Sequence, residues 1–348
     1  MNFTQEVISW YLINKRDLPW RETRDPYIIW LSEIIMQQTR VEQGMSYFRR
    51  FAENYPTVAD FASASEDEIL KHWQGLGYYS RGRNMHHTAQ VVMEEHAGYF
   101  PKKYDELLKL KGIGEYTAAA ISSFSADEAK AVVDGNVFRL LSRYFGIDTP
   151  INSSAGKKVF TALANEVLDK GAPGIYNQAV MEFGSLQCKP VNPACSVCPL
   201  QPGCEAYRSM RVAELPVKIQ PQKVRDRYFN FIVAVENEGM LMHKRGPKDI
   251  WENLYQLPLF ETATPINAAE LLEHEDFIDA FGNHVVIKRI SATVKHLLSH
   301  QRLHAQFIEI LNFTLNQENS RGWFYATSTD LSTLAQPKLI FEFLEKFD

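Results

Sequence analysis

Residues 188–204 read CKPVNPACSVCPLQPGC and contain every cysteine of the chain: Cys188, Cys195, Cys198 and Cys204. Their spacing, C-x6-C-x2-C-x5-C, predicts a metal site with four thiolate ligands. Two disulfides in so short a loop are a weaker alternative, because nothing in the sequence indicates an oxidising compartment. Structural zinc stays open, although zinc sites usually pair their cysteines in two C-x2-C knuckles set well apart. An iron–sulfur cluster also takes four thiolates and suits a single uneven loop better.

The composition is ordinary for a globular protein. The chain has 348 residues, of which 45% are hydrophobic and 23% charged, and this length allows two or three domains. Its first residues lack a basic segment followed by an apolar run, and no stretch would span a bilayer, so we expect an intracellular protein without signal peptide or membrane contact. The net charge of −5 argues against a generally basic nucleic-acid binder. Any DNA binding must therefore rest on local patches and backbone amides.

The hydrophobic pattern changes once along the chain. Residues 1–208 repeat with a 3.6-residue period, which predicts an all-α region that ends with the cysteine loop. Helices are expected at 7–13, 27–51, 66–73, 83–95, 104–110, 116–124, 137–145, 155–168 and 176–183. Residues 209–226 are polar, contain two prolines and indicate a linker. Residues 227–348 mix β-rich runs with short helical segments, which predicts a compact α+β domain. Its strands are expected at 228–235, 285–294, 303–313 and 323–326.

A Gly-x-Gly turn lies within residues 110–121, LKGIGEYTAAAI, between an apolar helix end and an Ala-rich helix start. Gly112 and Gly114 permit backbone conformations that other residues resist, and they let the main chain approach a ligand closely. The amides at the start of the following helix lack partners and, with the helix dipole, favour a bound phosphate. An ordinary helical turn also explains a bare GxG, so this motif gains its weight from the cysteine loop downstream.

Together, the hairpin and the cysteine loop resemble the iron–sulfur branch of the helix–hairpin–helix DNA glycosylase superfamily. The resemblance implies a catalytic region with a six-helix barrel lobe and a cluster lobe, one 4Fe-4S cluster on the four cysteines, and double-stranded DNA as the partner. In this superfamily the cluster lies in a loop that contacts DNA. Two kinds of enzyme in the branch share this cysteine spacing: endonuclease III and the A/G-specific adenine glycosylases.

The hairpin distinguishes these two kinds. Enzymes like endonuclease III carry a lysine two residues after the second glycine, and its amine attacks the sugar and leads to strand cleavage through a Schiff base. Here that position is Tyr116, and Lys111 precedes the hairpin. A phenol cannot form the imine, so no strong lyase activity is expected.

Residues 32–39, SEIIMQQT, resemble the adenine glycosylase segment that contains the catalytic glutamate. Glu33 lies in a run that is apolar on nearly every side, a pattern typical of a helix that is buried all round. Burial disfavours the charged carboxylate and raises its pKa, which suits a general acid near neutral pH. A salt-bridged or capping glutamate is the alternative, and the cost of burying a carboxylate in such a run makes it less favourable.

Residues 132–137, VVDGNV, match the family's second carboxylate at Asp134. An aspartate before a helix is also a favoured N-cap, and the two roles can coexist. The resemblance implies that Glu33 protonates adenine at N7 and that Asp134 stabilises the oxocarbenium character at C1′. It makes Tyr116 and Asn136 supporting groups for this intermediate, and Glu33 the base for the incoming water. The target adenine must first leave the base stack.

A second loop, residues 75–84 (GLGYYSRGRN), resembles the family's wedge. The resemblance implies that Leu76 and Tyr78 intercalate near the opposing base. Arg81 and Arg83 are expected to meet phosphates. A Gly-rich turn with core aromatics is the alternative.

Two more segments match family positions. Gln38 and Thr39 follow the Glu33 segment, and the resemblance implies that Gln38 probes the DNA strand. Trp20 and Arg21 match a family segment that lines the adenine pocket. All four residues are therefore expected at the DNA or the flipped base.

Residues from about 227 resemble the Nudix-like recognition domain of adenine glycosylases, and residues 251–258, WENLYQLP, fit it. The clustered glutamates of a catalytic Nudix box are absent, so no pyrophosphatase activity is expected. Family members use a Phe-Ser-His loop to recognise 8-oxoguanine, and this chain has Leu298-Ser299-His300. The resemblance assigns the hydrogen-bonding roles to Ser299 and His300, whereas Leu298 removes an aromatic face. An ordinary β-hairpin loop is the alternative.

The sequence thus predicts a multi-domain protein: an all-α helix–hairpin–helix glycosylase domain with an iron–sulfur cluster loop (1–208), a linker (209–226), and a C-terminal α+β Nudix-like domain (227–348). The expected function is that of a monofunctional adenine DNA glycosylase of base excision repair. It removes adenine mispaired with 8-oxoguanine or guanine, as a monomer, in the cytoplasm and with the nucleoid if the source is bacterial. The runner-up is a pyrimidine glycosylase/lyase like endonuclease III. A non-catalytic iron–sulfur DNA-binding or redox-sensing protein is the third candidate, against which Glu33 and Asp134 argue.

Overall fold

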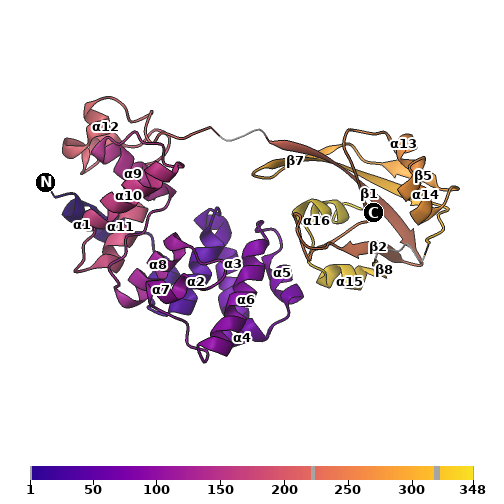
Figure 1. Ribbon diagram of the computed structural model, residues 1–348, viewed down its shortest axis with the longest axis horizontal. Coiled ribbons are helices and arrows are strands. Elements are labelled where there is room, and N and C mark those ends of the chain that lie inside the picture. The colour runs from indigo at the N-terminus through magenta and orange to yellow at the C-terminus, as the bar shows by residue number, and fades with distance from the viewer. Residues whose placement is uncertain (1, 221–223, 317–321, 348) are drawn as a thin grey trace. The chain divides into compact units, whose positions relative to one another are not determined.

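The computed structural model describes residues 2–220, 224–316 and 322–347 of the chain (Figure 1). The chain divides into two compact units. The first consists of Met1–Ser63 and Asn84–Gln220, and the second of Ala64–Arg83 and Pro221–Asp348. Among the helices described, none is both long and apolar enough to cross a membrane.

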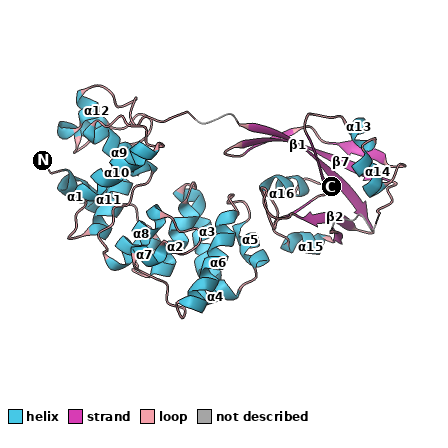
Figure 2. Ribbon diagram, viewed as in Figure 1, coloured by secondary structure: helices cyan, strands magenta, loops and turns pink. Residues whose placement is uncertain are grey.

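Helices alone build the described part of the first unit (Figure 2), which confirms the expected all-α region. Its elements are α1 (Phe3–Asn14), η1 (Pro19–Arg21), α2 (Pro26–Met36), α3 (Val41–Asn54), α4 (Val58–Ser63), α6 (Ser80–Glu95), α7 (Tyr104–Leu107), α8 (Glu115–Ala126), α9 (Gly135–Phe145), α10 (Ser154–Glu166), α11 (Pro173–Leu186), η2 (Cys195–Val197), η3 (Gln201–Gly203) and α12 (Glu205–Arg208). The first residues of α6 belong to the second unit, so this helix runs from one unit into the other.

The expected helix over residues 27–51 is wrong in its extent, because the structure divides it into α2 and α3. The break begins at Gln37, whose ψ of 121° leaves the helical region, and continues at Gln38, whose φ of 55° is in the left-handed region. Helix α2 begins cleanly, since Asp25 accepts a hydrogen bond from the Tyr27 amide and Pro26 occupies the first turn. The turn between the two helices therefore holds the Gln38 and Thr39 positions singled out in the sequence.

One hydrophobic cluster of the first unit lies between α1, α9, α10 and α11. Phe160 and Phe183 are fully buried in it, and Leu140 from α9 packs with them. Cys188 and Cys198 pack against the same cluster. The helix that begins beside Asp134 and the loop that carries the cysteines therefore share one core, which fixes their relative positions.

The polar segment predicted as a linker is bonded to the first unit over much of its length. Arg143 donates from Nε to the Leu215 carbonyl at 3.0 Å, and the Ile151 amide donates to the Val217 carbonyl at 3.0 Å. Of the predicted linker, residues 221–223 lie outside the described residues. The next element begins at Arg225.

A mixed sheet forms the centre of the second unit (Figure 2). Its strands are β1 (Arg225–Glu236), β2 (Gly239–Lys244), β3 (Tyr255–Gln256), β4 (Leu259–Thr262), β5 (Val286–Ile290), β6 (Val294–Leu297), β7 (Gln301–Leu311) and β8 (Trp323–Ala326). The order is β3-β2-β1-β7-β5, while β4 pairs with β1, β6 with β7 and β8 with β2. Strands β1 and β7 run parallel, and the other pairs are antiparallel.

Helices cover both faces of this sheet. Phe229 and Phe231 of β1 pack on one side with Ile340 of α16 (Lys338–Leu344), where α15 (Ser328–Thr333) also packs. Ile232 of β1 packs on the other side with Phe277 of α14 (Glu275–Phe281) and with α13 (Ala268–Leu272). This alternation follows from the two-residue period of a strand. The unit also includes α5 (Glu66–Trp73), which begins with a Ser65–Glu68 capping box.

Candidate active site

Helix α2 places Glu33 in the interior of the first unit, with 8% of its surface exposed. The Tyr116 hydroxyl donates a hydrogen bond to Glu33 Oε2 at 2.7 Å. Burial raises the pKa of Glu33 to about 7, the Tyr116 hydrogen bond lowers it in part, and the charge of Asp134 raises it further. Glu33 is therefore poised to exchange a proton near neutral pH.

The Gly-x-Gly turn sets the position of Tyr116 at the start of α8. Gly112 has a φ of +80°, and a Cβ there would lie 2.9 Å from the Asn84 Cβ, so this position requires glycine. Gly114 precedes the helix as its N-cap without a side-chain hydrogen bond. The first amides of α8 consequently have no side-chain cap and point outward, as an anion-binding helix start requires.

Asp134 caps the start of α9, and its charge raises the pKa of Glu33. Its Oδ1 accepts from the amides of Asn136 at 2.9 Å and Val137 at 2.7 Å, and its Oδ2 accepts from Asn136 Nδ2 at 2.7 Å. Burial raises the pKa of Asp134 above its usual range, and these hydrogen bonds limit the rise. Capping thus holds the carboxylate in one orientation.

Glu33, Tyr116 and Asp134 line one cavity of roughly 990 Å³. Gln38 also lines it, from the turn after α2, and Gly114 lines it from the hairpin. The volume lies within the range of small-molecule sites and is large enough for one nucleoside. Two carboxyl groups with different hydrogen-bond environments in one cavity are an arrangement suited to cleaving a glycosidic bond.

Arg21 binds a buried carboxylate that the sequence analysis missed. Its Nη1 and Nη2 donate to Glu182 at 3.0 and 2.8 Å, and Arg16 binds the same carboxylate. Glu182 is 1% exposed, and these arginines lower its pKa to about 2 against the effect of burial. The charge of Arg21 also acts on Glu33. Trp20 packs edge-on against Phe48, with ring centroids 4.9 Å apart.

The sequence comparisons assign the family. Residues 31–165 match the model of the HhH-GPD superfamily base excision DNA repair proteins, and residues 230–346 match the NUDIX domain. An adenine DNA glycosylase of Buchnera aphidicola subsp. Schizaphis graminum is 33% identical over 99% of this chain and 98% of its own length. The chain belongs to the adenine DNA glycosylase family. A human adenine DNA glycosylase is 40% identical over 61% of this chain and 41% of its own length.

Solved structures support the fold of this family member. A thermostable thymine-DNA glycosylase aligns with a TM-score of 0.56 and 29% identity over 60% of this chain and 95% of its own. A trapped endonuclease III–DNA covalent intermediate aligns with a TM-score of 0.52 over 60% of this chain and 94% of its own. At 22% identity the second likeness shows the fold alone. With the two family models, these likenesses confirm the expected helix–hairpin–helix domain followed by a Nudix-like domain.

The four cysteines of this family member line one pocket of the first unit with Arg143 and Leu200. Among the described residues, no three His, Cys, Asp or Glu side chains are arranged to hold a single metal ion. A 4Fe-4S cluster places one thiolate on each iron, so its ligands surround a larger group than one zinc ion. Arg143 Nη1 lies 3.5 Å from Cys188 Sγ and supplies a positive charge beside the thiols. Four thiols that line one pocket are the donor set of a 4Fe-4S cluster, and structural zinc takes the same four donors.

One hydrogen-bond chain joins the cysteine loop to Asp134. Arg139 donates from Nε to the Cys188 carbonyl and from Nη2 to Asn136 Oδ1, both at 2.8 Å. Its Nη2 also donates to the Gly184 carbonyl at 2.6 Å. Asn136 in turn donates to Asp134. The position of the first cysteine is thus coupled to the orientation of the Asp134 carboxylate.

In the second unit, the loop after α5 presents Tyr78 and buries Leu76. Tyr78 is 48% exposed with a φ of 48°, whereas Leu76 is 7% exposed. The Arg81 guanidinium lies over the Tyr78 ring, 5.6 Å from its centroid. Arg83 donates to the Glu252 carbonyl at 2.8 Å. Of the four residues of this loop that are expected at DNA, namely Leu76, Tyr78, Arg81 and Arg83, only Tyr78 is exposed.

The Leu298–His300 loop lies between β6 and β7 in the same unit. Ser299 Oγ and the Tyr78 hydroxyl lie 2.5 Å apart. Leu298 packs against the core cluster on the α16 side of the sheet. The structure thus brings the expected wedge tyrosine and the expected recognition serine together and anchors the leucine inward.

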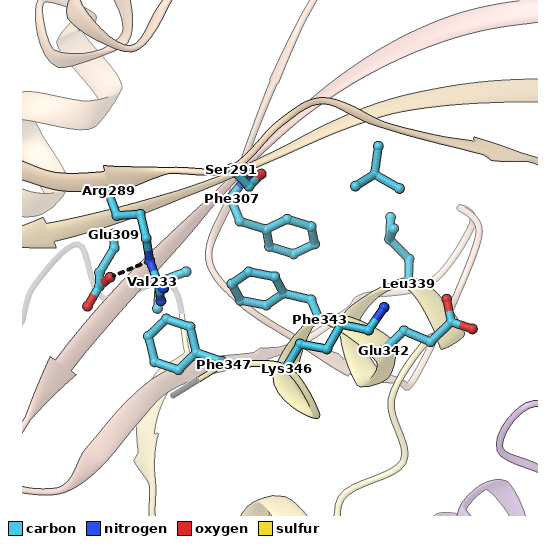
Figure 3. Close-up of a pocket in the computed structure, with 11 residues that line it drawn as sticks. Val233, Arg289, Ser291, Phe307, Glu309, Leu339, Glu342, Phe343, Lys346 and Phe347 are labelled. Carbon is cyan, nitrogen blue, oxygen red and sulfur yellow. Dashed lines mark hydrogen bonds and ion pairs between the residues drawn. The ribbon is translucent and has the colours of Figure 1, made fainter.

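Another cavity of the second unit, about 340 Å³ in volume, lies between the sheet and α16 (Figure 3). The rings of Phe307 and Phe343 stack there with centroids 3.8 Å apart. Arg289 Nε donates to Glu309 Oε2 at 3.2 Å at its edge. None of the site residues expected from the sequence lines this cavity.

Proposed function

We propose that this chain is a monofunctional adenine DNA glycosylase of base excision repair. It hydrolyses the N-glycosidic bond of adenine mispaired with 8-oxoguanine or guanine, after the adenine has been flipped out of double-stranded DNA. The observation that carries the proposal is the buried Glu33, with a pKa of about 7, in the same cavity as Asp134. The names of its relatives in bacteria and animals support the choice of adenine.

The chemistry begins with proton transfer from the Glu33 carboxyl to N7 of the flipped adenine. The bond between C1′ and N9 then breaks, and its electron pair leaves with the base. Asp134, oriented by Asn136 and the Val137 amide, stabilises the positive charge at C1′. Water adds at C1′ and gives its proton to the Glu33 carboxylate. Tyr116 supports the ionised form of Glu33 after the first transfer by its hydrogen bond.

Tyr116 carries the monofunctional part of the proposal. Its hydroxyl donates to Glu33, and a phenol forms no Schiff base with the sugar. Borohydride should therefore trap little enzyme on DNA that contains A opposite 8-oxoguanine. Efficient trapping would instead support a glycosylase/lyase like endonuclease III.

We assign the DNA contacts to short segments of the chain instead of a generally basic surface. The outward amides after Gly112 and Gly114 bind a phosphate without a basic surface, which suits a net charge of −5. Gln38 and Thr39 probe the strand, Trp20 and Arg21 line the adenine pocket, and Leu76, Tyr78, Arg81 and Arg83 form the wedge and its phosphate contacts. Ser299 and His300 recognise 8-oxoguanine. The buried Leu76 needs a local rearrangement before it can intercalate.

Cys188, Cys195, Cys198 and Cys204 hold one 4Fe-4S cluster in this proposal. The cluster supplies a rigid, charged crosslink for the loop 188–204 and takes no part in base excision. Arg143 and Arg139 fix the loop to the first unit. We further propose that residues 1–208 act as the catalytic region, 209–226 as the linker and 227–348 as the recognition domain of a monomer, with segment 64–83 of the catalytic region packed in the second unit.

A panel of duplexes tests the function. Adenine is placed opposite 8-oxoguanine, guanine, cytosine or thymine, and release of the free base is measured with enzyme in excess. We expect excision opposite 8-oxoguanine and guanine and little opposite cytosine and thymine. Release of pyrimidines, or no release from any duplex, would overturn the proposal.

A further inference from the structure

The segment 64–83, which carries the Tyr78 loop, is bonded to the sheet domain at several points. Asp67 of α5 accepts from Lys244 Nζ of β2 at 2.7 and 3.1 Å, and from the Tyr255 hydroxyl of β3 at 3.0 Å. Asn253 Nδ2 donates to Glu66 Oε1 at 2.6 Å. One side of α5 is therefore held by three side chains of the sheet domain.

A second set of bonds lies at the other end of the segment. The Tyr79 hydroxyl donates to the Gln336 carbonyl at 2.9 Å, in a buried position. The Gln336 amide donates to Gln74 Oε1 at 3.0 Å, and Lys71 Nζ donates to the Leu334 carbonyl at 3.1 Å. Residues 334–336, just before α16, are thus bonded to both sides of the turn that leads to Tyr78.

The loop between these anchors is itself constrained. Trp73 Nε1 donates to the Gly77 carbonyl at 2.9 Å, and Arg81 Nη2 donates to the same carbonyl at 3.1 Å. Tyr78 is held at a positive φ, which a tyrosine adopts only where its surroundings impose it. Its hydroxyl then meets Ser299 Oγ at 2.5 Å. Strained backbone in such a loop indicates a function for the residue that bears it.

We propose that segment 64–83 and the sheet domain form one recognition module, in which Asp67, Lys244, Tyr79 and Gln336 are positioning residues that preset the spacing between Tyr78 and Ser299. The inference rests on the proposed function and deepens it. Guanine and 8-oxoguanine differ by one oxygen and one N–H group, so their discrimination needs polar groups at fixed positions. A module ordered before binding loses less conformational entropy when the lesion arrives.

The chain offers variants that loosen the module without touching the catalytic cavity. Tyr79→Phe removes one hydroxyl, and Lys244→Met removes the charge opposite Asp67. The control Tyr325→Phe removes a hydroxyl from β8 of the same domain, outside the segment, and Lys244→Arg retains the positive charge. The readout is the single-turnover rate of adenine release opposite 8-oxoguanine, divided by the rate opposite guanine.

The double variant Tyr79→Phe/Lys244→Met should lower this ratio by about 2- to 10-fold, the effect of ordering one or two side chains on binding, and leave release opposite guanine unchanged. Tyr325→Phe should retain the wild-type ratio. Lys244→Arg should retain most of the wild-type ratio, because arginine keeps the positive charge opposite Asp67. An unchanged ratio in the double variant, or an equal loss on both duplexes, would overturn the proposal.

Hydrogen exchange of the full chain separates this proposal from the proposed function. If the wild-type chain releases no adenine, the function fails, and the module is still tested by the exchange rates. In the double variant the amides of residues 74–83 and 296–301 should exchange faster than in the wild type. Unchanged protection of both segments would overturn the module whatever the substrate is.

Discussion

Replacing Glu33 by glutamine should stabilise the folded chain at alkaline pH. Burial raises the pKa of Glu33 to about 7 in the folded state, whereas an exposed glutamate in the unfolded chain has a pKa of about 4.3. Folding therefore disfavours the ionised carboxylate, and stability is lost as the pH rises from the unfolded pKa through the folded one. Glutamine has nearly the same shape, still accepts from Tyr116 and stays neutral throughout.

The size of the effect follows from the pKa difference. A rise from 4.5 to about 7 corresponds to about 3 kcal/mol, since one pKa unit is worth about 1.4 kcal/mol. Near pH 5 only about a quarter of this destabilisation has developed, because the folded carboxyl is still protonated and the unfolded one is partly ionised. At pH 8 nearly all of it is present. The advantage of Glu33→Gln over the wild type should therefore grow by about 2 kcal/mol between these two pH values.

Urea unfolding at pH 5 and pH 8, followed by far-ultraviolet circular dichroism, measures this difference in the helical unit. The matched control is Glu53→Gln, at an exposed glutamate near the end of α3, and it should show no such pH dependence. If Glu33→Gln differed from the wild type by the same amount at both pH values, the buried, proton-poised carboxyl would be refuted.

Four further substitutions probe the site. Tyr116→Phe removes the hydrogen bond that lowers the pKa of Glu33, so the alkaline limb of the excision rate should move up by about one pH unit. His300→Ala should lower the preference for 8-oxoguanine over guanine by about tenfold in single-turnover assays. Cys198→Ser should reduce iron content and DNA affinity before it slows excision of bound substrate. Arg139→Gln should slow excision more than it weakens DNA binding, because it frees the side chain that orients Asp134.

For each of these four substitutions, one result would contradict the prediction. If the alkaline limb of the excision rate did not move in Tyr116→Phe, the Tyr116 hydrogen bond would not lower the pKa of Glu33. If His300→Ala kept the preference for 8-oxoguanine over guanine, His300 would not be a recognition residue. Full iron content in Cys198→Ser would remove that thiol from the cluster. Equal losses of binding and excision in Arg139→Gln would indicate a folding defect instead of misorientation.

The parts of the site that the sequence predicted are those set by local patterns. Glu33 was found by the resemblance of residues 32–39 to a family segment and by its apolar neighbours in one helix, and the structure buries it beside Tyr116. Asp134 was found by the match of residues 132–137 to the family, and the N-cap that its place before a helix predicts is present at α9. The cysteines were found by spacing alone, and they line one pocket. Predictions of this kind hold in the folded chain because they depend on neighbouring residues and not on contacts between distant segments.

The features that the sequence analysis missed depend on long-range contacts. Glu182 lies in an apolar helix just as Glu33 does, but its role as the partner of Arg16 and Arg21 needs a contact across more than 160 residues of chain. The same argument applied to residues 176–183 would have singled it out. That segment 64–83 joins the sheet domain was also invisible, since Asp67 and Lys244 are ordinary charged residues until they meet.

The assignment of Glu33 as the acid is tested most directly by adenine release from a duplex with A opposite 8-oxoguanine. Wild type and Glu33→Gln are compared under single-turnover conditions, with binding to the same duplex measured in parallel. The amide cannot donate a proton as the carboxyl does, so we predict loss of adenine release with mismatch binding largely retained. Release by Glu33→Gln at the wild-type rate would contradict the central claim.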